Sequence, residues 1–139
     1  MKDFRENIEF YIEQYDLEKQ IFLVGEKVFE RGCLTKEEFL IFCLWKSRRP
    51  KRWYDLNTEE EIERVTKLSF SEKDETKKIT LLTKLKGVSI PTASAILSIV
   101  NPKLYPIIDE RCVQSLNELG FINWETINNK NWLDYLKII

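Results

Sequence analysis

Apolar side chains recur along this chain at the three- and four-residue spacing of α-helices. The spacing predicts an amphipathic helix within residues 4–15 and another within residues 21–28 that ends at Gly32; one bent helix would give the same pattern. No segment of strand length alternates apolar and polar residues, and Gly and Pro are rare, with four of each. The sequence therefore predicts an all-α fold, a compact helical bundle.

Capping signals mark the starts of three later helices. Thr35 with Glu38, and Thr58 with Glu61, have the spacing of a capping box, in which each side chain bonds the other residue's backbone N–H group. Ser71 is placed to cap the helix that follows. We therefore expect short helices joined by short loops.

A tight turn between two helices is predicted around Gly87. This glycine can adopt the positive φ that ends a helix, and Pro91 has the fixed φ that suits the first turn of the next one. The two helices and their turn form a helix-hairpin-helix unit over about residues 79–100. Asp109 then caps a further helix over about residues 110–119.

Composition narrows the chemistry. The 139 residues, 43% of them apolar, fit one helical domain over residues 1–139. The chain has no histidine, which excludes imidazole bases and histidine-ligated zinc, so carboxylates must do any acid–base work. Cys33, Cys43 and Cys112 are too widely spaced for a disulfide framework or a metal cluster. No apolar run approaches the roughly 18 residues of a membrane span. We expect a cytoplasmic protein with no metal, no cofactor and no membrane partner.

Positive charge is concentrated in one place, although the formal net charge is only −1. Residues 46–52, which we call the basic segment, contain five cations and no acid: Lys46, Arg48, Arg49, Lys51 and Arg52. The segment fits a loop that lies against a phosphodiester backbone, with Trp45, Trp53 or Tyr54 near enough to stack; it equally fits a solvated loop. The four tryptophans, which are Trp45, Trp53, Trp124 and Trp132, are expected in the core or lining a cleft.

The turn around Gly87 is a candidate phosphate site, because its backbone N–H groups lie at the positive end of a helix dipole. The residues that would contact DNA there are Lys86, Gly87, Val88, Ser89 and Thr92. The alternative is an ordinary turn without a ligand. Asp109 also allows two interpretations, an N-cap or an ionised carboxylate that stabilises positive charge on a sugar. The two roles are compatible.

Two stretches of the chain carry a further pattern: Leu85-x-Gly87-Val88-x-x-x-Thr92-Ala93 and Tyr105-Pro106-Ile107-Ile108-Asp109. The pattern resembles the helix-hairpin-helix DNA glycosylase superfamily, in its endonuclease-III-like and adenine-mismatch branches. Asp109 follows Gly87 by 22 residues, a spacing that agrees with these branches. The resemblance implies a bundle with a cleft, double-stranded DNA with a damaged or mismatched base as partner, and Asp109 as the catalytic carboxylate for base excision beside a flipped-out nucleotide.

The differences from the family pattern shape the expected chemistry. Pro91 occupies the position of the lysine that attacks the sugar in bifunctional relatives, so no amine is expected and hydrolysis of the N-glycosidic bond should be monofunctional. Lys86 replaces the proline of the hairpin and Ser89 its second glycine, so we expect strain at Ser89 if that position has positive φ. The cysteine pattern of the iron–sulfur branch is absent, so no cluster is implied.

Two alternatives remain open at this point. Only 30 residues follow Asp109, which favours a non-catalytic helix-hairpin-helix module that binds DNA without a base pocket. A helical protein-interaction domain is the third possibility, since the overall acidity permits it.

Overall fold

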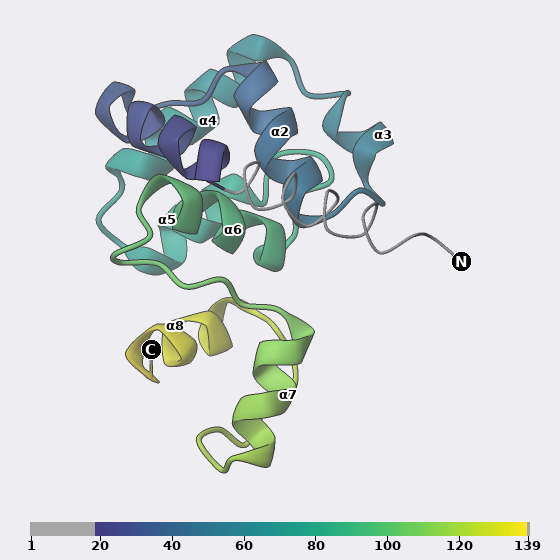
Figure 1. Cartoon of the computed structure of the whole chain (residues 1–139), viewed down its shortest axis with the longest axis vertical. Helices are drawn as coiled ribbons and strands as arrows, with labels where there is room; N and C mark the ends of the chain where they lie inside the picture. The colour runs from purple at the N-terminus through teal and green to yellow at the C-terminus, as the bar shows by residue number, and fades with distance from the viewer. Residues whose placement is uncertain (1–18, 139) are drawn as a thin grey trace, which may run out of the picture.

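The structure, a computed structural model, describes residues 19–138, and every regular element in this range is a helix (Figure 1). The prediction of an all-α fold is confirmed. A helix over residues 19–31 is followed by α2 (Lys36–Lys46), α3 (Lys51–Tyr54), α4 (Glu59–Ser71), α5 (Glu75–Leu82), α6 (Ile90–Val100), α7 (Glu110–Glu118) and α8 (Asn129–Ile138). The helix predicted within residues 4–15 lies outside the described residues.

The first capping box forms as predicted. The Glu38 N–H group donates to the Thr35 hydroxyl at 3.2 Å, and the Thr35 N–H group donates to the Glu38 carboxylate at 2.9 Å. At the start of α4 the structure contains one bond of the second predicted box, from the Glu61 N–H group to the Thr58 hydroxyl. Both helices therefore begin where their capping residues place them.

The predicted cap at Ser71 is wrong. Ser71 is the last residue of α4, and its hydroxyl donates back to the Lys67 carbonyl at 2.9 Å. Asp74 caps α5 instead, accepting from the Lys77 N–H group at 3.1 Å. A carboxylate at this position also interacts favourably with the positive end of the helix dipole, which a serine hydroxyl does not match.

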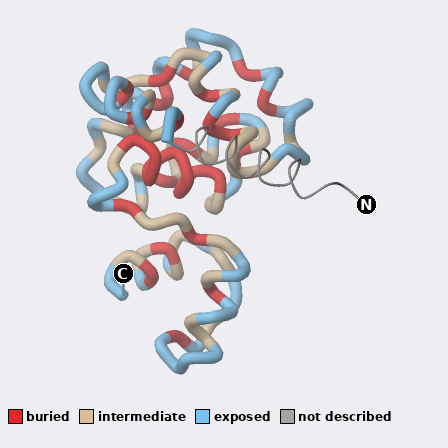
Figure 2. Tube along the Cα trace, viewed as in Figure 1, coloured by how far each residue is buried: buried red, intermediate tan, exposed pale blue. Residues whose placement is uncertain are grey.

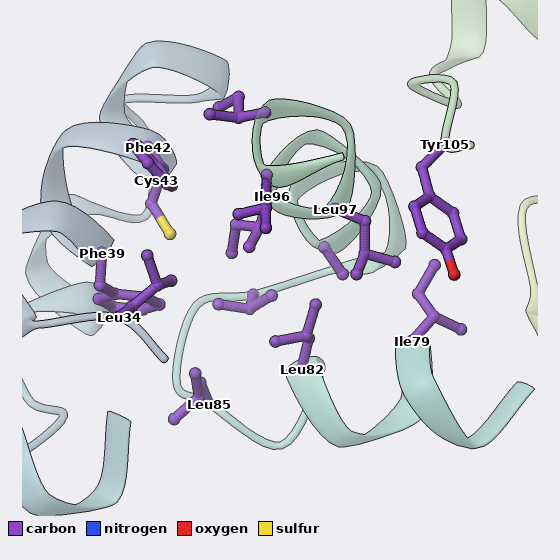
Figure 3. Packing of buried hydrophobic residues seen from close by; sticks show 14 of the residues in the cluster. Leu34, Phe39, Phe42, Cys43, Ile79, Leu82, Leu85, Ile96, Leu97 and Tyr105 are labelled. Carbon is purple, nitrogen blue, oxygen red and sulfur yellow. The ribbon is translucent and has the colours of Figure 1, made fainter. Parts of the chain in front are cut away.

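Helix α6 forms the centre of the bundle. All its residues from Thr92 to Val100 are buried, which makes it the most continuously buried segment in Figure 2. Figure 3 shows Ile96 and Leu97 of α6 between the side chains of α2 and those of α5. Small residues over 93–95 let the neighbouring segments approach the α6 backbone closely.

Helices α7 and α8 both lie at one end of the bundle (Figure 1), where α8 packs against α5. The segment that leads into α7 is fastened to α6, because the Ile108 N–H group donates to Ser94 Oγ at 3.0 Å. It is also fastened to α8, whose Tyr135 hydroxyl donates to the Ile107 carbonyl at 2.8 Å. These two bonds fix the backbone directly before Asp109. No helix within residues 19–138 is long and apolar enough to cross a bilayer.

The turn between α5 and α6 packs closely against α3. Gly87 has the positive φ that the sequence predicts, +83°, and a Cβ atom built there would lie 2.8 Å from Tyr54 Cδ1 and 3.1 Å from Trp53 Cβ. The buried Asn57 side chain clamps the same turn, since it accepts from the Lys86 N–H group at 2.8 Å and donates to the Lys86 carbonyl at 3.0 Å. The turn and α3 therefore form one packed unit.

Gly87→Ala should destabilise the fold more than Gly120→Ala. Both glycines have positive φ, +83° and +81°, so both variants carry the backbone cost of about 1 kcal/mol. Only Gly87 has atoms within 4 Å of the added methyl group. Urea unfolding should show a further loss of about 1–3 kcal/mol in the free energy of unfolding for Gly87→Ala. Equal losses in the two variants would contradict the close packing of the turn on α3.

Candidate DNA-binding surface and recess at Asp109

An open recess lies where three helices end. Its volume is about 370 Å³, within the range of roughly 300–1,000 Å³ typical of small-molecule sites. The recess is bounded by the C-terminal end of α2 and the N-terminal ends of α6 and α7, with these lining residues: Lys46, Ser47, Pro50, Ser89, Pro91, Thr92, Asp109, Glu110 and Arg111. It therefore joins residues from the basic segment, the turn around Gly87 and the predicted catalytic position.

Asp109 lies at this recess as the N-cap of α7, as predicted. Its Oδ1 atom accepts from the Cys112 N–H group at 2.9 Å. Its Oδ2 atom lies 3.2 Å from Lys46 Nζ, and the two form an ion pair. The Asp109 side chain retains 32% of its exposure, so the carboxylate is not sealed within packed hydrocarbon.

The pKa of Asp109 is held below its ordinary value. Partial burial raises this pKa, but the hydrogen bonds from Cys112 and Lys46, together with the Lys46 charge, outweigh burial. Asp109 is consequently ionised at neutral pH. An ionised carboxylate can stabilise developing positive charge or orient water, but it cannot donate a proton as a general acid.

Lys46 is the main correction to the expected chemistry. The sequence suggested that no amine would be present, because Pro91 occupies the family's lysine position. Pro91 does line the recess, yet the Lys46 ammonium lines it too, from a different helix. Lys46 also differs from the other cations of the basic segment, since its side chain is only 19% exposed and faces Asp109.

The turn around Gly87 offers fewer free donors than the sequence suggested. The Lys86 N–H group donates to Asn57, and the Val88 N–H group donates to the Leu85 carbonyl. The Val88 side chain is buried. Lys86 and Ser89 have exposed side chains, while Gly87 is half-buried. Thr92 is 2% exposed but lines the recess.

The strain expected at Ser89 is absent. Ser89 has φ −96° and ψ 176°, which is extended backbone, and it serves as the N-cap residue of α6. The turn accommodates serine because its single positive φ falls on Gly87. Pro91 occupies the first turn of α6, as predicted.

The remaining cations of the basic segment lie outside the lining of this recess, and Arg48 and Lys51 line a second pocket together with Trp45. All of these cations have exposed side chains: Arg48, Arg49, Lys51 and Arg52. The segment is not simply a loop, because α3 begins at Lys51. The Tyr54 hydroxyl donates to the Ser47 carbonyl at 3.1 Å, which ties the start of the segment to the end of α3.

The tryptophans differ in their surroundings. Trp132 is fully buried, in accord with the prediction of a core residue, and Trp45 and Trp124 are half-buried. Trp53 is 49% exposed, so a core position is wrong for this tryptophan. Trp53 follows the basic segment directly, and its own Cβ atom packs near Gly87.

Two further possibilities at this site are a nucleophilic cysteine and a bound metal ion. Burial and a hydrogen bond to Asp109 raise the pKa of the Cys112 thiol, which therefore stays protonated and is a poor nucleophile. Among residues 19–138, no group of three or more cysteine, aspartate or glutamate side chains is arranged to hold a metal ion.

Sequence reasoning missed two residues that position the site. The sequence does not predict the contacts of Asn57 with Lys86, although an asparagine just before a helix cap is a typical turn residue. Ser94 was noted only for its size, yet its hydroxyl donates to the Pro91 carbonyl at 2.7 Å while it accepts from Ile108. Neither partnership has a signal in local sequence, because each joins segments more than ten residues apart.

Comparison of the chain with models of known protein families, with curated proteins and with solved structures gives no match.

Lys46→Met should raise the pKa of Asp109, because the variant removes both the hydrogen bond and the positive charge at Oδ2. Carbon NMR of the Asp109 carboxyl group across acidic pH would measure this change. A folded-state pKa below the unfolded value of about 3.9 means that the ion pair stabilises the fold above that pH. The stabilisation, up to about 1 kcal/mol, is lost as the pH falls through the folded-state pKa.

Lys46→Arg is the matched control, since the guanidinium keeps the charge and can reach the same carboxylate. It should leave the pKa of Asp109 near the wild-type value. An unchanged pKa in Lys46→Met would show that the ion pair does not form in solution.

Proposed function

We propose that this protein binds double-stranded DNA and hydrolyses an N-glycosidic bond, as a monofunctional base-excision glycosylase. The observation that carries the proposal is the Asp109 carboxylate, which is ionised and partly exposed at a recess bordered by the turn around Gly87 and the basic segment. The resemblance of residues 85–93 and 105–109 to helix-hairpin-helix glycosylases supports the same assignment.

In this proposal the positively charged surface holds the DNA backbone. The turn supplies Lys86 and Ser89, whose side chains are exposed. The start of α6, where Ser89 makes no side-chain cap hydrogen bond, adds the positive end of the helix dipole. A target nucleotide rotates out of the duplex and enters the recess, which places its sugar beside Asp109.

The proposed reaction breaks the bond between the sugar C1′ atom and the base nitrogen. Positive charge then develops on the sugar, and the Asp109 carboxylate stabilises it at short range. A water molecule supplies its oxygen to C1′ while the departing base nitrogen gains a proton. Since Asp109 is ionised at neutral pH, it does not supply this proton, and the attacking water releases one as its oxygen bonds to C1′.

Lys46 would change partners during this cycle. In the free protein its ammonium occupies Asp109 Oδ2. Phosphates of bound DNA compete for the ammonium, and its transfer to a phosphate would leave Oδ2 facing the sugar. In both states the ammonium has an anionic partner, first Asp109 and then a phosphate, so we assign it to charge pairing and not to attack on the sugar. Monofunctional hydrolysis therefore remains our proposal although an amine lines the recess.

A second candidate is a non-catalytic DNA-binding module with the same surface. The hydrogen bonds of Asp109 favour it, because both carboxylate oxygens already have partners within the protein, as a purely structural cap would. A helical protein-interaction domain has no comparable support, since its partner would have to tolerate the dense charge of the basic segment.

Asp109→Asn should abolish base release while leaving DNA binding intact or tighter. Asparagine caps helices about as well as aspartate, so the fold should be retained, and loss of a negative charge reduces repulsion of phosphates. The measurement uses duplexes that contain deaminated, alkylated or mismatched bases, followed by alkali to cleave abasic sites. Loss of the stabilising charge should slow release by at least about 100-fold.

Three outcomes of this assay are informative. If the wild-type protein binds DNA but releases no base, the non-catalytic module is correct. If Asp109→Asn releases base at the wild-type rate, Asp109 is only a cap. If borohydride traps a covalent adduct that Lys46→Arg eliminates, the reaction passes through a Schiff base and the monofunctional assignment is wrong.

Replacing Arg48 and Arg49 together by alanine should weaken DNA binding and its salt dependence. If the basic segment neutralises about five phosphates, the wild-type slope of log affinity against log salt should be about −4 to −5. The double variant should flatten this slope by about two units. Lys73→Ala with Lys77→Ala removes the same charge from exposed positions outside the segment and should leave the slope near wild type. An unchanged slope in the Arg48 and Arg49 variant would remove the basic segment from the interface.

A further inference from the structure

Trp53 is a large aromatic side chain in an unusual place. The side chain is 49% exposed even though the Arg52 guanidinium lies over its ring, 5.3 Å from the ring centroid. The Trp53 carbonyl accepts a hydrogen bond from the Leu56 N–H group, which fixes the backbone of this residue. Much of its ring faces solvent.

The position of Trp53 is rigidly defined by its neighbours. Tyr54, the next residue, is fully buried and packs edge-on against Phe39, with ring centroids 6.0 Å apart. On the other side, the turn around Gly87 approaches so closely that a methyl group there would lie 3.1 Å from Trp53 Cβ. The Asn57 clamp holds this turn against α3. The ring is thus presented on a fixed base, which limits the entropy lost when a ligand stacks on it.

The charge around Trp53 identifies the kind of ligand. Arg52 lies over the ring, and Arg48, Arg49 and Lys51 are exposed in the same segment, whereas Lys46 is paired with Asp109. The exposed Lys86 side chain adds a cation beside Gly87, and Asp55 is the one acid within two residues of Trp53. An apolar protein partner would have to desolvate these cations. A nucleic-acid base brings a flat π-face for the ring and phosphates for the cations.

We infer that Trp53 is a stacking residue that selects DNA containing an unpaired or displaced nucleotide. Bases in a regular duplex are stacked on each other and present no free face, whereas a base beside a bulge, a mismatch or an extruded nucleotide does. The inference rests on the proposed DNA-binding function and names its substrate class: duplex DNA with a local break in base stacking.

Fluorescence anisotropy with three labelled probes tests this inference: a fully paired duplex, the same duplex with one unpaired base, and a single strand of the same length. The wild-type protein should bind the duplex with the unpaired base more tightly than the paired duplex. Trp53→Ala should remove that preference, with a loss of roughly 5- to 150-fold on the unpaired-base duplex, as expected for one lost stacking contact. Its affinity for the paired duplex should change much less.

Two variants serve as controls. Trp53→Phe keeps an aromatic face and should retain most of the preference. Leu56→Ala removes an exposed apolar side chain, 51% exposed, from the same short segment, and should bind all three probes like the wild type. Because Trp53 is not part of the core, urea unfolding of Trp53→Ala should match the wild type and exclude misfolding as the cause.

The outcomes separate this inference from the proposed function. Binding to the paired duplex without a preference for the unpaired base overturns the role of Trp53 but leaves DNA binding intact. Equal losses on all three probes in Trp53→Ala also overturn it. A preference that depends on Trp53, in a protein that releases no base, supports the inference and contradicts catalysis. If none of the probes binds, both are overturned.

Discussion

The burial of α6 is the constraint on which the rest of the described structure depends. Its apolar and small side chains must be covered on every side, so α2 and α5 pack around it and residues 101–108 lie close to it. That packing fixes where the N-terminal end of α6 emerges, which is at the recess. It also fixes Asp109, because Ser94, in the buried part of α6, holds the backbone of Ile108. The geometry of the candidate site is therefore a consequence of the hydrophobic core and not of a mobile surface loop.

The Lys46–Asp109 ion pair connects two features that are separate in the sequence, the basic segment and the capping aspartate. The basic segment was expected to meet phosphates and Asp109 to meet a sugar, yet one cation of the segment bonds the carboxylate directly. The arrangement makes physical sense at a site that binds a nucleotide, since a sugar and its phosphate are only a few bonds apart. A protein that holds both needs a cation and a carboxylate at a similar separation, and in the absence of DNA these two charges neutralise each other.

Much of the fold could be predicted because its signals are local. The capping box at Thr35, the positive φ of Gly87 and the cap at Asp109 depend on residues within a few positions of each other, and all three formed as expected. The Ser71 cap failed because two plausible capping residues lie three positions apart and only packing decides between them. Three contacts at the site join residues 14 to 63 positions apart: Asn57 with Lys86, Ser94 with Ile108, and Lys46 with Asp109. No periodicity or spacing within one sequence encodes such partners.

The choice between enzyme and binding module comes down to the Oδ2 atom of Asp109. A carboxylate whose two oxygens both keep their protein partners cannot direct its charge at a sugar, so catalysis requires that Lys46 give up its bond when DNA arrives. The energetics permit this exchange, because an ion pair at a partly exposed site is worth about 1 kcal/mol or less, whereas a DNA phosphate offers the same ammonium an equivalent partner within a strongly negative field. The catalytic role differs from a structural cap in that the cation comes from the segment expected to meet phosphates, so that bound DNA can remove it from Oδ2. The location of Lys46 at the head of the basic segment, and not on α7 itself, is thus the feature that favours the catalytic interpretation.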